Sequence, residues 1–148
     1  MTAEALIAYL HFLSILAVAS LLLGELLLYR PGLTLSQARL LGKVDLAYGG
    51  AALAALATGL LRVFAKGASF YLDNPLFHAK WTLFVLIALV SLVPTVHYMR
   101  WRPALSEGRA PVISPGAFRL VRRLLLVEVH LLALMPLLGV LMSRGIGR

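Results

Sequence analysis

The feature that most constrains this chain is a set of four long apolar stretches, which occupy residues 5–29, 44–64, 76–99 and 122–142. A helix rises about 1.5 Å per residue, so roughly 20 apolar residues cross a hydrocarbon layer of about 30 Å. All four stretches meet that length. The sequence therefore predicts an all-α fold, in which residues 1–148 form a single integral membrane domain built as a four-helix bundle.

Hydrophobic residues make up 61% of the chain, and its formal net charge is +8. In a soluble protein that charge would suggest nucleic acid as a partner, but here the basic residues gather in the first and third connections between spans. The positive-inside rule predicts that these connections are cytoplasmic and that both termini lie outside, with the lipid bilayer, not nucleic acid, as the partner. The basic residues concerned are Arg30, Arg39, Lys43, Arg100, Arg102, Arg109, Arg119, Arg122 and Arg123.

Local signals mark where the helices begin and how they pack. Thr34, with Gln37 three residues on, has the spacing of a capping box, and Asn74-Pro75 and Ser114-Pro115 each place a capping residue before a proline. Pro31-Gly32 ends the first helix after Arg30, and residues 102–113 are expected to form a polar loop. Residues 48–59 are rich in Gly and Ala at four-residue spacing, which predicts close helix contact in lipid.

Several groups that hydrocarbon solvates poorly lie within the spans, and such groups are where function is expected. With the N-terminus outside, four basic residues are expected toward the outer side of the membrane: His11, Arg62, His78 and Lys80. The acids Glu25 and Asp45 are expected toward the inner side, together with Tyr48 and His97. Asp45 is expected to pair with Lys43, and His97 to anchor the inner interface. The groups are His11, Glu25, Asp45, Arg62, His78, Lys80, His97, Glu128 and His130.

The histidines limit which cofactor can be held. His78 and His97 are about 29 Å apart along one helix and cannot share a ligand. His11 and His78 lie on different helices at similar depth, as the two axial imidazoles of an iron porphyrin require, and His130 is the other candidate partner of His11. The chain has no cysteine, which excludes disulfides, iron–sulfur clusters and covalent haem attachment.

Short segments carry a resemblance to known families. Tyr9-Leu10-His11, the Asn-Pro-Leu-Phe-His-Ala-Lys run ending at Lys80 and Pro94-Thr95-Val96 resemble, nearly end to end, a family of small bacterial four-span membrane proteins without an assigned activity. More distantly, His11 with His78-Ala79-Lys80-Trp81 and His97-Tyr98 is similar to the HemJ-type protoporphyrinogen IX oxidases. The overall plan resembles the CopD-like copper-resistance membrane proteins. The resemblance implies the bacterial cytoplasmic (inner) membrane as location, b-type haem as cofactor, His11 as an axial ligand and Lys80 as a cofactor-site or catalytic residue.

The leading hypothesis is a b-type haem-binding membrane protein with a redox role, and a membrane oxidoreductase if it is an enzyme. His11 with His78 or His130 would ligate the iron, and Arg62 and Lys80 would lie near the propionates. Lys80 and Glu128 are the candidate catalytic residues. A quinone or another electron-transfer partner would exchange electrons with such a protein, and a homodimer would enclose a larger site than four short helices.

Two alternatives stay open. One is a membrane protein that handles a metal or an ion, with His11, His78, His130 and Glu128 as ligands of copper or zinc, or with Glu25, Asp45 and Glu128 as a proton path. Soft ligands for Cu(I) are sparse in this chain. The other is a non-catalytic assembly subunit whose second helix packs against a partner, so that Gly50→Leu abolishes complex formation.

Overall fold

The computed structural model describes residues 2–147, apart from the side chains of residues 66, 68 and 70. Its helices are α1 (Ala3–Leu28), α2 (Leu35–Lys66), α3 (Ala68–Leu72), α4 (Pro75–Met99), α5 (Arg102–Ser106) and α6 (Pro115–Ser143), and the described residues include no strand. Four of these helices, α1, α2, α4 and α6, are long and apolar enough to cross a membrane. The predicted all-α membrane bundle is confirmed.

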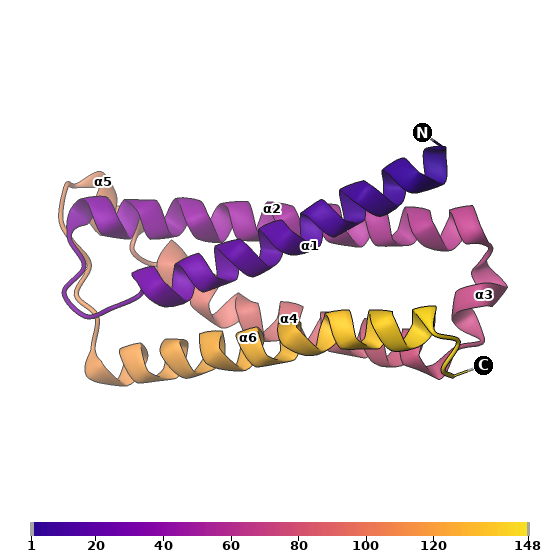
Figure 1. Ribbon diagram of the computed structural model, residues 1–148. Helices are drawn as coiled ribbons and strands as arrows, with labels where there is room; N and C mark the ends of the chain where they lie inside the picture. Colours follow the sequence, from indigo (N-terminus) through magenta and orange to yellow (C-terminus); the bar gives the residue numbers. More distant parts are fainter. Residues whose placement is uncertain (1, 148) are drawn as a thin grey trace.

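The four long helices form two pairs that lie against each other (Figure 1). α1 runs diagonally across α2, α4 packs along α6, and the pairs meet where α1 contacts α6 and α2 contacts α4. Both termini lie at one end of the bundle together with α3, which we call the terminal end. The opposite end carries α5 and the α1–α2 connection, and we call it the α5 end. Which end faces the cytoplasm stays a prediction from the basic connections.

The predicted helix starts are confirmed. Thr34 and Gln37 form a reciprocal capping box at the start of α2, in which each side chain accepts a hydrogen bond from the other's backbone N–H. Asn74 caps α4 and Ser114 caps α6, each followed by a proline that needs no hydrogen-bond partner for its nitrogen. α1 ends at Leu28, slightly before the expected position, because Tyr29 leaves the helical conformation and becomes its C-cap.

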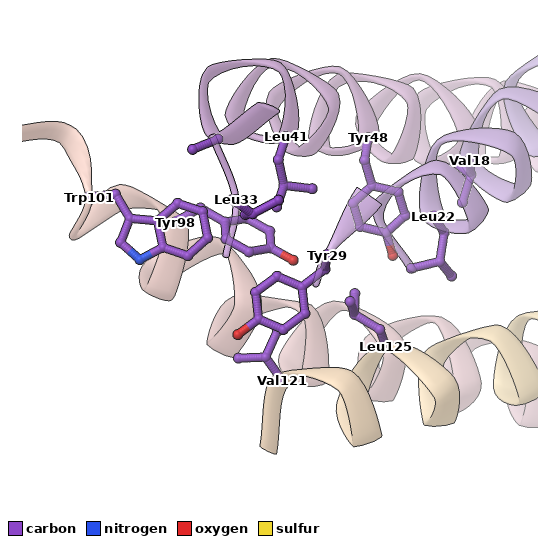
Figure 2. Close-up of a cluster of buried hydrophobic side chains, with 11 residues drawn as sticks. Val18, Leu22, Tyr29, Leu33, Leu41, Tyr48, Tyr98, Trp101, Val121 and Leu125 are labelled. Carbon is purple, nitrogen blue, oxygen red and sulfur yellow. The ribbon is translucent and has the colours of Figure 1, made fainter. Parts of the chain in front are cut away.

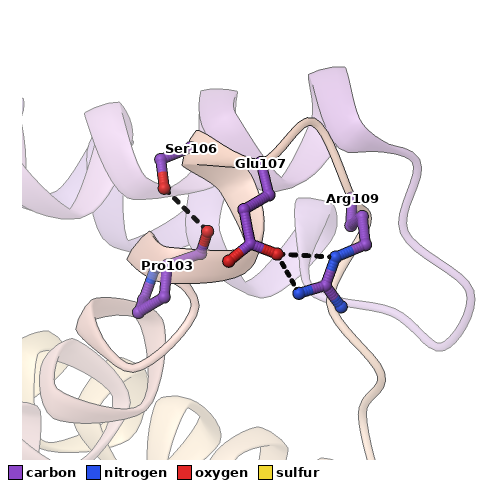
Figure 3. A network of polar contacts seen from close by, with 4 residues as sticks. All are labelled: Pro103, Ser106, Glu107 and Arg109. Carbon is purple, nitrogen blue, oxygen red and sulfur yellow. Dashed lines mark hydrogen bonds and ion pairs between the residues drawn. The ribbon is translucent and has the colours of Figure 1, made fainter.

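The connection between the third and fourth spans is more ordered than expected. In place of a continuous polar loop it contains the short helix α5, which tolerates Pro103 because the proline stands in the first turn. Figure 3 shows how the connection is held: the Ser106 hydroxyl donates to the Pro103 carbonyl at 2.7 Å, and Arg109 pairs with Glu107. The helix α3 was likewise not predicted.

Buried apolar side chains gather in the half of the bundle near the α5 end, where the C-terminal half of α1 meets the other long helices (Figure 2). The outward faces carry large apolar side chains instead, and Leu27, Leu46 and Phe64 are 77%, 74% and 75% exposed. Lipid solvates such a surface, whereas water does not. The buried set is Val18, Leu22, Tyr29, Leu33, Ala38, Leu41, Tyr48, Tyr98, Trp101, Val121 and Leu125.

The small residues of α2 fall on two faces with different surroundings. Gly59 lies against α1, since a Cβ added there would come within 3.2 Å of the His11 ring. Ala51 and Ala55 are packed against the core. A Cβ added to Gly50 would meet nothing within 4 Å. The predicted close contact therefore holds on the face of α2 that meets α1, and within one chain it does not extend to Gly50.

Candidate functional site

Three helices bring carboxyl groups together at the edge of the buried core. Glu25 on α1 is 1% exposed and Glu128 on α6 is 0% exposed, while Asp45 on α2 is partly buried. Glu25 lies within electrostatic reach of both Asp45 and Glu128. We call these three residues, with the hydroxyl groups of Tyr48 and Tyr98, the carboxyl site.

The local sequence explains why these acids point inward. Glu25 continues a stripe on α1 that includes Val18 and Leu22, at helical spacings of four and three residues. Glu128 occupies the same place on α6, after Val121 and Leu125. In each helix the stripe that builds the core therefore also carries a carboxyl group.

Neighbouring hydroxyl groups satisfy only some of these polar atoms. Tyr48 donates a hydrogen bond to Glu128 Oε2 at 3.2 Å, and Thr95 donates to Asp45 Oδ1 at 2.7 Å. The predicted Asp45–Lys43 ion pair is wrong, because the helix turns Asp45 toward Thr95 on α4 while Lys43 is exposed.

Three polar atoms of the site are fully buried without a hydrogen-bond partner. They are Glu25 Oε1, Glu128 Oε1 and the Tyr98 hydroxyl. Nearly all buried polar groups in proteins are satisfied by protein or by ordered water, and an unsatisfied one is costly. Among the residues that the structure describes, the ion pair formed is Arg109–Glu107 in the α4–α6 connection, so no cation is paired with the site.

A second polar group lies nearer the terminal end and is basic. His11 Nδ1 is 2.9 Å from the Thr58 hydroxyl, which itself donates to the Ala54 carbonyl at 2.7 Å. A hydroxyl has one proton to give, so when Thr58 donates to the Ala54 carbonyl, His11 Nδ1 is the donor and Nε2 keeps its lone pair. Lys80 and Arg62 are within electrostatic reach of His11. We call His11, Arg62 and Lys80 the basic group.

The surroundings of the basic group are more open than those of the carboxyl site. A cavity of about 280 Å³ opens between α1 and α2, lined by Arg62 with residues of the first turns of α1, among them Thr2 and Glu4. The Lys80 amino group lies toward α6, 3.9 Å from the position of a Cβ added to Gly139.

The other two predicted histidine ligands are exposed and contact nearby backbone carbonyls. His78 is exposed, and its Nε2 is 2.8 Å from the Leu72 carbonyl. His130 is also exposed, with its Nδ1 2.6 Å from the Leu126 carbonyl of its own helix. Within residues 2–147, no group of three or more His, Asp or Glu side chains is placed to hold a metal ion. His11 is the candidate ligand that the structure partly buries, and its pairing with a second histidine on haem iron stays a prediction.

Sequence reasoning missed one residue near the carboxyl site. Tyr29 is 0% exposed, and its hydroxyl is 3.2 Å from His97 Nε2. The His97 ring is thus partly exposed at the α5 end and held by Tyr29, and its place at the membrane interface stays a prediction. The available signal was the spacing of four residues from Glu25 to Tyr29, which continues the inward stripe of α1.

Comparison with known proteins identifies a family and no characterised relative. A family model described as a predicted membrane protein (DUF2214) matches residues 3–147. No curated protein and no solved structure matches the chain.

Proposed function

The chain belongs to this family of predicted membrane proteins (DUF2214), and we propose that it binds protons at the carboxyl site and passes them across the bilayer. The observation that carries the proposal is the burial of Glu25 and Glu128, both at most 1% exposed, with one oxygen of each unpartnered. A buried carboxylate without a cation is strongly destabilised, so the proton is the charge that compensates it. Ionisable groups inside a membrane commonly mark proton or ion pathways.

The arrangement suits transfer as well as binding. Glu25 lies within electrostatic reach of Asp45 and Glu128, so ionisation of one carboxyl group opposes ionisation of the others. When one carboxyl group loses its proton, its negative charge therefore favours proton binding by the neighbouring carboxyl groups. Tyr48 and Thr95 hydrogen-bond to Glu128 and Asp45 and hold those side chains in place.

Proton flux into liposomes tests the proposal directly. Purified protein is reconstituted with a trapped pH-sensitive dye, and a potassium gradient with valinomycin sets the membrane potential. We expect flux above that of protein-free liposomes, and we expect Glu128→Gln and Glu25→Gln to return it to the protein-free rate. Glu107→Gln is the matched control, because Glu107 is an exposed acid of the α4–α6 connection. Flux that survives both variants contradicts the proposal.

Chemical labelling gives an independent measurement. Hydrophobic carbodiimides react with protonated carboxyl groups in apolar surroundings, and mass spectrometry of the digested protein identifies the residue modified. We expect adducts on Glu25 or Glu128 and none on Glu107. An adduct on Glu107 with none on either buried acid contradicts the proposal.

A second candidate function is binding of b-type haem in a redox role, and the observation that favours it is the geometry of His11. The Thr58 hydroxyl contacts Nδ1, and the tautomer in which Nδ1 donates would leave Nε2 to a ligand, as a partner outside the first coordination shell does for a metal-binding histidine. Arg62 and Lys80 would pair with the propionates. Bound haem would supply one-electron chemistry, and a quinone or another carrier would be the electron partner.

The absorption spectrum of the purified protein tests this second function. Haem gives a Soret band and, after reduction with dithionite, an α-band. We expect His11→Ala to lose both bands and His130→Ala, which alters an exposed histidine, to keep them. Protein from haem-sufficient cells that is colourless and does not take up haemin excludes the function.

A further inference from the structure

We propose that Tyr29 and His97 form a relay through which the carboxyl site exchanges protons with the α5 end of the bundle. This inference rests on the proposed proton function and names its route. The Tyr29 hydroxyl is 3.2 Å from His97 Nε2, within hydrogen-bond distance. Tyr29 is fully buried, whereas His97 is partly exposed, so the pair connects the interior with the surface.

Tyr98 links this pair to the carboxyl site. Its ring centroid is 5.8 Å from that of Tyr29, and its hydroxyl is buried without a partner. Tyr98 is within electrostatic reach of Glu25, Glu128 and Tyr29. Glu25 and Tyr29 also lie one helical turn apart, since the Tyr29 N–H donates to the Glu25 carbonyl at 2.8 Å.

Aromatic rings enclose the pair and keep bulk water from bypassing it. Trp101 and Phe118 stack on the Tyr29 ring at centroid distances of 6.4 and 5.5 Å. Trp101 also meets the His97 ring edge-on at 5.0 Å. The Tyr98 ring on α4 contacts both rings of the pair, and Arg100 at the end of α4 lies within electrostatic reach of His97. α6 faces it with Phe118 and the Ala117 carbonyl.

The chemistry of the two side chains suits a relay. A tyrosine hydroxyl both donates and accepts hydrogen bonds, and imidazole gains and loses a proton near neutral pH. His97 Nε2 takes the Tyr29 hydroxyl proton while the Tyr29 oxygen takes one that a bridging water carries from a protonated carboxyl group of the carboxyl site. His97 then releases a proton from its other ring nitrogen to water at the α5 end. One proton enters and one leaves, so the step balances.

The liposome assay separates a relay from a structural role. We expect Tyr29→Phe and His97→Ala to lower proton flux by about tenfold or more, while carbodiimide labelling of the carboxyl site persists. Imidazole added on the side of the α5 end should restore flux in His97→Ala, because it replaces the missing proton carrier. His130→Ala is the matched control, since His130 is exposed on the outside of α6.

The outcomes distinguish this inference from the function it rests on. If Glu128→Gln abolishes flux and Tyr29→Phe and His97→Ala do not, the relay is wrong and the carboxyl site stands. If the wild-type protein shows no flux, both fail. If Tyr29→Phe does not fold, His97→Ala decides alone: rescue by imidazole supports the relay, and loss of flux without rescue overturns it.

Discussion

At the scale of single residues, the carboxyl site depends on one tyrosine hydroxyl. Tyr48 supplies the hydrogen bond to Glu128, whose other oxygen has no partner. Tyr48→Phe removes that bond and leaves a buried carboxyl group unsatisfied, so we expect a loss of stability of about 1–3 kcal/mol. Unfolding of the detergent-purified variant measures it. Tyr9→Phe is the control, because Tyr9 is 55% exposed; equal stability of both variants contradicts the role given to Tyr48.

Tyr29 lies just beyond α1 and adds a pH dependence. Burial raises the pKa of Tyr29 from 10.0 to about 12. The folded state therefore holds this proton more tightly than the unfolded state, and the resulting stabilisation is complete below pH 10 and lost as pH rises toward about 12. We expect Tyr29→Phe to flatten this alkaline loss by about 1–3 kcal/mol. Unfolding curves across that range test it, and parallel slopes for variant and wild type contradict it.

Part of the site could be predicted at this scale. Glu128 and His130 are two residues apart and thus about 200° apart around a helix, so only one of them can face the core. The apolar stripe of Val121 and Leu125 selects Glu128, and the structure agrees. Hydrogen bonds between residues of different helices could not be predicted from helical spacing. Asp45 bonds to Thr95 and Tyr29 to His97 because of how the helices are rotated and offset, which spacing along one chain does not specify.

At the scale of helices, the contact between α1 and α2 depends on one glycine. A Cβ at Gly59 would lie 3.2 Å from the His11 ring, whereas at Gly50 it would meet open space. We expect Gly59→Leu to push the ring from Thr58 and to destabilise the protein by about 1–3 kcal/mol. Gly50→Leu is the matched control and should unfold like the wild type. Equal destabilisation by both would contradict this packing.

Asn74 joins α3, α4 and the C-terminal turn. Its Oδ1 accepts from the Leu76 N–H at 2.9 Å, and its Nδ2 donates to the Ile146 carbonyl at 3.2 Å. We expect Asn74→Ala to destabilise the terminal end by about 1 kcal/mol or more, because a buried cap is lost. Hydrogen exchange should quicken in the first turn of α4 and near Ile146. Asn74→Asp keeps the oxygen that caps α4 but loses the amide donor to Ile146, so exchange should stay slow in α4 and quicken near Ile146. Unchanged exchange in Asn74→Ala would contradict the role of Asn74 in joining the two segments.

For the helices, too, features set by neighbouring residues could be predicted from the sequence, and features set by distant contacts could not. The starts of α2, α4 and α6 were predictable because each cap is a contact between residues three or fewer positions apart. The short helices α3 and α5 were not, since each has five residues and no hydrophobic period marks so short an element. α5 is fixed partly from outside, by Arg39 of α2 donating to the Leu105 carbonyl at 2.8 Å.

At the scale of the whole molecule, the bundle is asymmetric along its axis. The buried core and the carboxyl site lie toward the α5 end, and the basic group and the cavity lie toward the terminal end. The proposed proton path would therefore have the cavity beside Arg62 at one end of the bundle and the ring cluster around Tyr29 and His97 at the other. Which side of the membrane each end of the path meets thus depends on which end faces the cytoplasm.

Orientation can be tested because the chain has no cysteine of its own. Val112 in the α4–α6 connection is 98% exposed and Ile146 near the C-terminus is 51% exposed, so a cysteine at either position is accessible. The basic connections predict that the α5 end is cytoplasmic. A membrane-impermeant thiol reagent added to intact cells should then label Ile146→Cys at once and Val112→Cys only after the membrane is permeabilised. The reverse pattern would place the α5 end outside, and the relay at Tyr29 and His97 would then open to the exterior.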